Sequence, residues 1–213
     1  SRTTAKITAV HGMKYADLIK NINFDTAKKY YLAALDGINY IKETVEGLNS
    51  PCSLEKMPFV LYSRLESERI LSEYAAVSRL NMIAKLTTKT QLPFNLTNAI
   101  RFDNAYTFNP VRFMNSLAGE LKVYTETKAL SVSGEKVFCQ GGNVVSASHI
   151  IVATHYPFIN KLGLYFAKMH QEKSYAAVFE NVPQFNEMYF CGEGKGYAFR
   201  LFEDKLIVSG TSH

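Results

Sequence analysis

The longest regular pattern of apolar positions lies between residues 27 and 48. Apolar side chains recur there at alternating four- and three-residue steps, which places them on one stripe and predicts a long amphipathic helix. Asp25 is the expected N-cap of this helix. The helix is expected to end at Asn49-Ser50-Pro51, because proline cannot continue a helix and disfavours helical geometry just before it.

Two further helices are predicted from their start signals. Ser63 and Glu66 have the spacing of a capping box, and the apolar positions that follow them recur at helical steps, at Ile70, Tyr74 and Val77. Asn109-Pro110 combines an N-cap residue with proline at the first helical position. The expected buried face of that helix consists of Phe113, Met114, Leu117, Ala118 and Leu121.

Strands are predicted wherever short apolar or alternating runs lie between turn signals. The run His149–Ala153 is apolar throughout its last four residues, which is typical of a parallel strand buried on both faces. Residues 84–97 are expected to be extended or looped, because they are rich in threonine and contain Pro93. The predicted strands are 59–62, 99–102, 121–125, 130–132, 136–139, 149–153, 174–179, 187–190, 197–202 and 206–209.

These elements predict an α+β fold, which would form part of an α/β fold in a longer protein. One part is expected to be a mixed or antiparallel sheet with helices. The other part is expected to be an incomplete domain, made of a helix, a β-meander and one buried parallel strand. Because the chain shows no initiator Met and breaks off after a strand-like run, we expect it to be an internal piece.

Composition narrows the classes of function. The net charge of +5 is scattered, with no block of like charges and no basic stripe with interleaved aromatics, which argues against nucleic-acid binding. No run approaches the ~18 apolar residues that a membrane span needs. The cysteines, Cys52, Cys139 and Cys191, are odd in number and widely spaced, which argues against a disulfide framework and a zinc site. They are interpreted as apolar fillers in a cytoplasmic protein.

The glycine cluster Gly192-Glu-Gly-Lys-Gly196 is interpreted as a hairpin loop. A phosphate-binding loop requires Ser or Thr after the lysine and a helix after the loop, whereas Tyr197 and a predicted strand follow this cluster.

Four segments resemble flavoproteins of the D-amino-acid-oxidase type, in the same order along the chain. The more specific two are Arg2–Gly12, which opens with Arg-Thr-Thr-Ala-Lys, and His149–Phe158, which contains Val-Ala-Thr-His-Tyr-Pro. Gly163–His170 and Tyr197–Arg200 resemble later pieces. The nearest subgroup is the bacterial FAD-dependent oxidoreductases, some of which carry a C-terminal Rieske domain. The resemblance covers essentially the whole chain.

The chain departs from the family in lacking its Gly-x-Gly-x-x-Gly fingerprint, whose glycines let the backbone approach the cofactor's pyrophosphate. FAD is therefore the cofactor expected of the parent protein, and this piece alone is expected to bind it weakly or not at all. No Rieske ligand pairs occur here, so no iron–sulfur cluster and no other metal is assigned.

The resemblance divides the chain into four predicted segments. Residues 1–24 form a loop that contacts FAD and a short helix, and residues 25–104 form a helical part of the substrate domain. Residues 105–160 are the remnant of the FAD-binding domain. Residues 161–213 supply antiparallel strands of the substrate domain.

Twelve residues are expected at the cofactor by resemblance. The same stretches allow plainer interpretations: an exposed basic tail, a helix-entry turn, and a tight turn before Pro157. The turn after the strand at 149–153 is favoured as a cofactor contact, since doubly wound sheets bind ligands at the carboxyl ends of their strands. The predicted cofactor-binding residues are Arg2, Thr3, Thr4, Lys6, His11, Gly12, Lys128, Ala129, Leu130, Ala153, Thr154 and His155.

Arg200 is the main candidate for binding a substrate, because its guanidinium suits a carboxylate and its strand is otherwise apolar. A solvated strand face is the alternative. Tyr156, Tyr175 and Tyr197 are candidate pocket walls or plain core. The chain is thus predicted to be the central piece of a flavin-dependent oxidoreductase. That enzyme would oxidise an amine, amino acid or similar small donor by hydride transfer to FAD.

The alternative is a non-catalytic binding domain that keeps the architecture without the cofactor. This piece alone is expected to be inactive. It is also expected to self-associate through the apolar strand at 149–153, because exposed apolar patches tend to pair.

Overall fold

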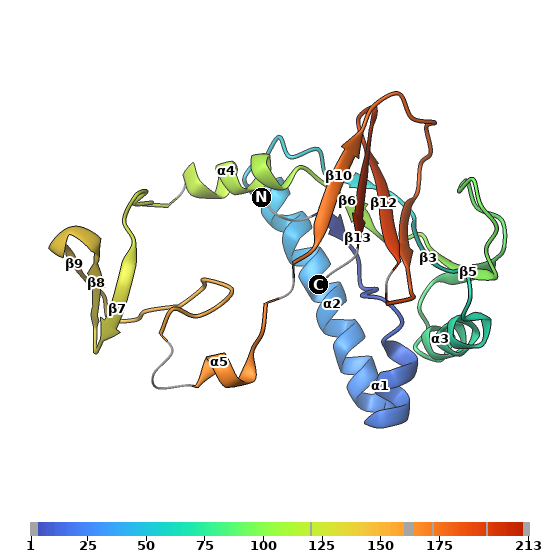
Figure 1. The fold of residues 1–213 in the computed structure, drawn as a ribbon, viewed down its shortest axis with the longest axis horizontal. Coiled ribbons are helices and arrows are strands. Elements are labelled where there is room, and N and C mark those ends of the chain that lie inside the picture. Colours follow the sequence, from blue (N-terminus) through green and yellow to red (C-terminus); the bar gives the residue numbers. More distant parts are fainter. Residues whose placement is uncertain (1–3, 120, 160–163, 172, 195, 211–213) are drawn as a thin grey trace. The chain divides into compact units, whose positions relative to one another are not determined.

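The computed structural model describes residues 4–119, 121–159, 164–171, 173–194 and 196–210. The chain divides into two compact units. Unit 1 comprises residues 1–120 and 174–213, and unit 2 comprises residues 121–173. Figure 1 shows the elements in chain order.

Unit 1 contains a seven-stranded sheet in the order β10-β13-β12-β11-β3-β5-β4. Only β11 and β3 are parallel neighbours, and the other pairs are antiparallel, so the predicted mixed sheet within an α+β fold is confirmed. Its strands are β3 (Phe59–Ser63), β4 (Ala84–Thr87), β5 (Asn98–Phe102), β10 (Tyr175–Phe179), β11 (Met188–Cys191), β12 (Tyr197–Phe202) and β13 (Lys205–Gly210).

A small second sheet of unit 1 ties the N-terminal segment to the rest. Strand β6 (Tyr106–Thr107) lies between β1 (Lys6–Ile7) and β2 (Glu55–Lys56), and both pairings are antiparallel. The helices of unit 1 are α1 (Tyr15–Asn21), α2 (Phe24–Gly47), α3 (Ser67–Arg79) and α4 (Pro110–Gly119).

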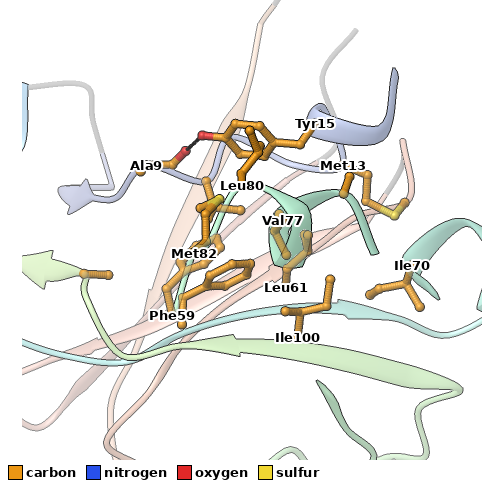
Figure 2. Packing of buried hydrophobic residues seen from close by; sticks show 14 of the residues in the cluster. Ala9, Met13, Tyr15, Phe59, Leu61, Ile70, Val77, Leu80, Met82 and Ile100 are labelled. Atoms are coloured by element: carbon orange, nitrogen blue, oxygen red, sulfur yellow. Dashed lines mark hydrogen bonds between the residues drawn. The ribbon is translucent and has the colours of Figure 1, made fainter. Parts of the chain in front are cut away.

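The main core lies on the face of the large sheet that α3 covers. Successive residues of a strand point to opposite faces, so Phe59 and Leu61 of β3 contribute to this core while Val60 and Tyr62 pack on the other face. Ile70 and Val77 of α3 are fully buried against the sheet, as their helical spacing predicts (Figure 2).

The N-terminal segment joins the same core through Tyr15. Tyr15 is fully buried at the start of α1, and its hydroxyl donates a 2.6 Å hydrogen bond to the carbonyl of Ala9 (Figure 2). This bond satisfies a buried phenol and fixes the chain that leads into α1.

Two helix starts differ from the predicted ones. Helix α2 is capped by Asn23, whose side chain accepts from Thr26 N at 2.8 Å, rather than by Asp25. Helix α3 begins at Ser67 rather than near Ser63, although Ser63 Oγ does accept from Glu66 N at 2.9 Å. The later start follows from a carboxylate of another loop that binds the amides before the helix, as described below.

The start of α4 is as predicted, whereas its apolar face is exposed. Asn109 caps the helix by accepting from Val111 N and Arg112 N, each at 3.1 Å. None of the α4 residues is buried, and Met114 is 57 % exposed. The apolar stripe needs a partner surface to be buried, and the described residues do not supply one.

Unit 2 contains a three-stranded antiparallel sheet, β7-β8-β9, which is the predicted meander. Its elements are β7 (Ala129–Ser133), β8 (Lys136–Cys139), the short 3-10 helix η1 (Gln140–Gly142), β9 (Val144–Ser146) and α5 (Tyr165–Lys168).

Two predicted strands, 121–125 and 149–153, do not form. The second was expected to be buried, yet Ile151 is 89 % exposed. A buried parallel strand requires neighbours on both sides, and no described strand pairs with residues 149–153. Its apolar side chains are therefore left on the surface of unit 2.

Candidate functional site

A cavity of about 650 Å³ in unit 1 opens between the N-terminal segment, the loop from β11 to β12, and the ends of β12 and β13. This volume is within the range of ligand pockets. Five glycines line it, so backbone rather than side chains forms much of the wall. The lining residues that bear on the site are Thr4, His11, Gly12, Lys14, Asp17, Arg69, Cys191, Glu193, Ser209 and the glycines at 192, 194, 196 and 210.

The predicted cofactor residues of the N-terminal segment partly meet in this cavity. Thr4, His11 and Gly12 line it, whereas Arg2 and Thr3 lie outside the described residues. Gly12 has a φ of +84°, a conformation that favours glycine and turns the chain toward α1.

The imidazole of His11 points its Nδ1 to the hydroxyl of Tyr30, 2.7 Å away. Partial burial and the nearby Lys14 lower the pKa of the imidazole, so it is neutral at physiological pH. A neutral ring next to the cavity can donate or accept a hydrogen bond without adding charge.

The start of α1, beside the cavity, is held by a buried carboxylate. Glu73 of α3 is completely buried and accepts hydrogen bonds from Tyr15 N at 3.0 Å and Ala16 N at 2.8 Å. Burial raises the pKa of Glu73, and the hydrogen bonds from the backbone oppose that rise. Glu73 was not among the predicted site residues. It could have been found, because a charged residue between Ile70 and Val77 falls on the apolar face of α3.

The glycine-rich loop between β11 and β12 is a hairpin loop, as predicted. Its glutamate, Glu193, binds the turn that leads into α3. Glu193 Oε1 accepts from Ser63 Oγ and Arg64 N at 2.7 Å and from Leu65 N at 2.6 Å. Partial burial raises the pKa of Glu193, but these hydrogen bonds outweigh it and lower the pKa overall. The loop is thereby fixed to the turn before α3.

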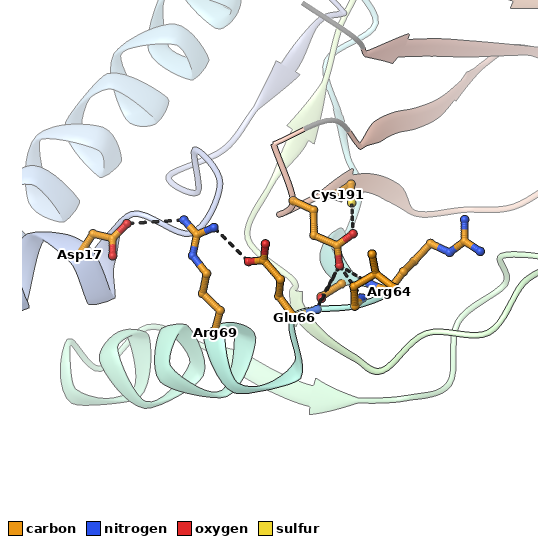
Figure 3. Close-up of polar contacts among 8 residues, drawn as sticks. Asp17, Arg64, Glu66, Arg69 and Cys191 are labelled. Carbon is orange, nitrogen blue, oxygen red and sulfur yellow. Dashed lines mark hydrogen bonds and ion pairs between the residues drawn. The ribbon is translucent and has the colours of Figure 1, made fainter.

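Two exposed ion pairs include Asp17 and Arg69, which line the cavity. Arg69 Nη2 lies 3.7 Å from Asp17 Oδ2, and Arg69 Nη1 lies 3.0 Å from Glu66 Oε2 (Figure 3). The first of these ion pairs links α1 to α3. In the same view the Cys191 thiol contacts Glu193 at 3.9 Å. Burial raises the pKa of Cys191, so the thiol is protonated at physiological pH.

Arg200 is buried rather than solvated. Its side chain lies in β12 with the residue only 3 % exposed, and it bonds to the carbonyl of Thr4 and, at 2.8 Å, to Thr107 Oγ1. Neither Arg200 nor the predicted Tyr175 and Tyr197 is among the described residues that line the cavity. The substrate roles of these residues stay predictions.

The remaining predicted residues belong to unit 2. The carbonyl of Lys128 accepts from Gln140 N at 2.8 Å, and Ala129 pairs with Cys139, so β8 occupies one edge of β7. The other edge of β7 carries no described strand. Ala153, Thr154 and His155 form an exposed turn closed by a 2.8 Å bond from Tyr156 N to the Thr154 carbonyl.

A scan against protein-family models finds no match. Among curated proteins, the chain is similar to YhfW of Bacillus subtilis (strain 168), named as a Rieske 2Fe-2S iron-sulfur protein, with 28% identity over 228 residues. The alignment covers 100% of this chain and 45% of that protein, so the chain spans less than half of its relative.

Solved structures share the fold. Glycine oxidase from Geobacillus kaustophilus superposes with a TM-score of 0.70 at 14% identity, covering 100% of this chain and 61% of the oxidase. L-α-glycerophosphate oxidase from Mycoplasma pneumoniae, solved with FAD bound, has a TM-score of 0.61 at 13% identity. The match covers 99% of this chain and 60% of that oxidase. The resemblance to flavoproteins of the D-amino-acid-oxidase type is thereby confirmed at the level of the fold.

Proposed function

We propose that this chain is the central part of a flavin-dependent oxidoreductase that oxidises an amine, an amino acid or a similar small donor. The observation that carries the proposal is the 650 Å³ cavity between the N-terminal segment and the β11–β12 loop, in a fold shared with a glycine oxidase and an FAD-bound oxidase. The residues present fit a flavin. A glycine-lined wall permits close approach of a flat ring, and Thr4 and His11 supply a hydroxyl and an imidazole.

FAD, when bound, supplies the electron acceptor for the hydride removed from the donor carbon. The protein's own residues bind, orient and exclude water. In this proposal Thr4, Lys6, His11 and Gly12, together with Arg2 and Thr3, contact the cofactor. For unit 2, the cofactor contacts that the resemblance implies at Lys128, Ala129, Leu130, Ala153, Thr154 and His155 stay predictions. The roles of Tyr156, Tyr175 and Tyr197 as walls of a substrate pocket stay predictions.

The 213 residues contain no Gly-x-Gly-x-x-Gly sequence, which supplies most of the pyrophosphate contacts in dinucleotide-binding folds. We therefore expect this piece alone to retain little FAD and to be inactive. The test is made on the full-length protein. Its purified form should show flavin absorbance that bleaches when a suitable amine or amino acid is added without oxygen. A full-length protein without flavin absorbance, even after incubation with FAD, would favour a non-catalytic binding domain.

A further inference from the structure

Arg200 lies in the middle of β12, where it bonds to three different segments. Its Nε donates to the carbonyl of Thr4, and its Nη1 donates to Thr107 Oγ1 at 2.8 Å and to the Leu201 carbonyl at 3.3 Å. These acceptors belong to the N-terminal segment, to β6 and to β12 itself. The planar fork of a guanidinium can serve acceptors in several directions at once, whereas a lysine ammonium lacks that fixed geometry.

The bonds converge on the segment that borders the cavity. Thr107 pairs with Lys6 in the β1–β6 ladder, and its hydroxyl also donates to the Ala5 carbonyl at 3.4 Å. Arg200 therefore holds Thr4 directly and holds the following residues through Thr107. Thr4 in turn lines the cavity.

The electrostatics of Arg200 also differ from those of a structural ion pair. Among the described residues, no carboxylate forms a salt bridge with Arg200 or with Lys6. Besides its neutral oxygen acceptors, the guanidinium has the ring of Phe202, whose centroid is 5.5 Å away. A buried cation without a carboxylate partner is costly, and these contacts must offset that cost. Strained or costly arrangements of this kind cluster at functional sites.

We propose that Arg200 is a positioning residue, whose guanidinium fixes the segment Thr4–Ile7 so that Thr4 is held at the cavity in which the flavin is proposed to bind. The proposal rests on the proposed function for the identity of the ligand. The anchoring of the segment does not depend on the proposed function, because it follows from the hydrogen bonds of Arg200 and Thr107. It also differs from a direct substrate role, because two nitrogens of the guanidinium are already engaged within the chain.

The test uses the full-length protein with the variants Arg200→Met, Arg200→Lys and Thr107→Val. Arg101→Met is the matched control, because Arg101 lies on β5 of the same sheet and is 40% exposed. The probe is FAD itself. Its dissociation constant from the stripped protein and the visible spectrum of the bound flavin are measured without any donor. Backbone hydrogen exchange at residues 4–7 is measured in the stripped protein.

We expect Arg200→Met to weaken FAD binding by about tenfold or more and to shift the flavin spectrum, as suits the loss of charge-assisted hydrogen bonds. Thr107→Val should act in the same direction by a smaller factor, and Arg200→Lys should recover part of the loss. Arg101→Met should leave both properties unchanged. Exchange at residues 4–7 should accelerate in Arg200→Met and Thr107→Val only.

A normal FAD dissociation constant and spectrum in Arg200→Met, with KM for the donor raised alone, would overturn the proposal in favour of a substrate ligand. If Arg200→Met does not fold, Thr107→Val decides, since it removes one acceptor with little change of shape. The proposed function fails separately: a wild-type protein that binds no FAD disproves it. If the wild-type protein binds no FAD, the anchoring is tested by hydrogen exchange alone. An unchanged rate of hydrogen exchange at residues 4–7 in Arg200→Met and Thr107→Val would then overturn it.

Discussion

Lys6 is half-buried at an energetic cost, which leads to a prediction with a definite sign and pH dependence. The side chain lies in β1, and among the described residues its Nζ donates a hydrogen bond to Thr4 Oγ1, 3.5 Å away. Burial, and then the charge of Arg200, lower the pKa of Lys6 from 10.5 to about 8. The folded state therefore binds the proton of Lys6 less tightly than the unfolded state does.

The size of the effect follows from linkage. A lysine whose pKa is about 8 when folded and 10.5 when unfolded costs the folded state about 3 kcal/mol at pH 7, at about 1.4 kcal/mol per pH unit. The cost is fully present below pH 8. It disappears as the pH rises from about 8 to 10.5, because the unfolded chain alone still binds the proton in that window.

We therefore expect Lys6→Met to stabilise the flavin-free protein by up to about 3 kcal/mol at pH 7. The gain should shrink steadily above pH 8, to about 1 kcal/mol at pH 10, and be nearly absent above about pH 11. Urea unfolding followed by circular dichroism at several pH values measures both quantities. Lys56→Met is the matched control, since Lys56 is exposed on β2 of the same small sheet and its replacement should change the unfolding free energy by less than about 0.5 kcal/mol.

A Lys6→Met protein that is less stable than the wild type at pH 7, or a difference that does not vary with pH, would refute the reasoning. The first result would mean that the ammonium has a stabilising partner. The second would mean that its pKa is the same in the folded and unfolded states.

Three further predictions concern the carboxylates and the exposed apolar run. Glu73→Ala should lower the unfolding free energy by about 3 kcal/mol in thermal melts, because the Tyr15 and Ala16 amides lose their acceptor, while Glu68→Ala, exposed on the same helix, should not. Glu193 has a lowered pKa, so its stabilisation is present above pH 4.5 and is lost as the pH falls through the folded pKa; Glu193→Ala should flatten that acid limb. Ile151→Asp should reduce self-association of the 213-residue piece in light scattering at high concentration, and an unchanged mass would count against this surface.

Local sequence signals determined much of the secondary structure. The apolar stripe between residues 27 and 48 corresponds to α2, and Asn109-Pro110 starts α4 as their capping chemistry predicts. The meander at β7 and β8 and the hairpin loop at 192–196 also follow from turn residues. Such features depend on neighbours in the chain, so the sequence contains nearly all the information they need.

Tertiary structure decided what those local signals could not. The apolar run at 149–153 reads as a buried strand, yet a parallel strand exists only beside others, and none pairs with it among the described residues. Arg200 fits a substrate ligand or a solvated cation by its sequence, and only the approach of Thr4 and Thr107 shows that it is buried and bonded. Glu193 also binds the Glu66 amide before α3, although the two residues are 127 positions apart in the chain. Interactions between residues so distant along the chain leave no local pattern, which is why the sequence predicted the elements of this site but not the contacts that hold it together.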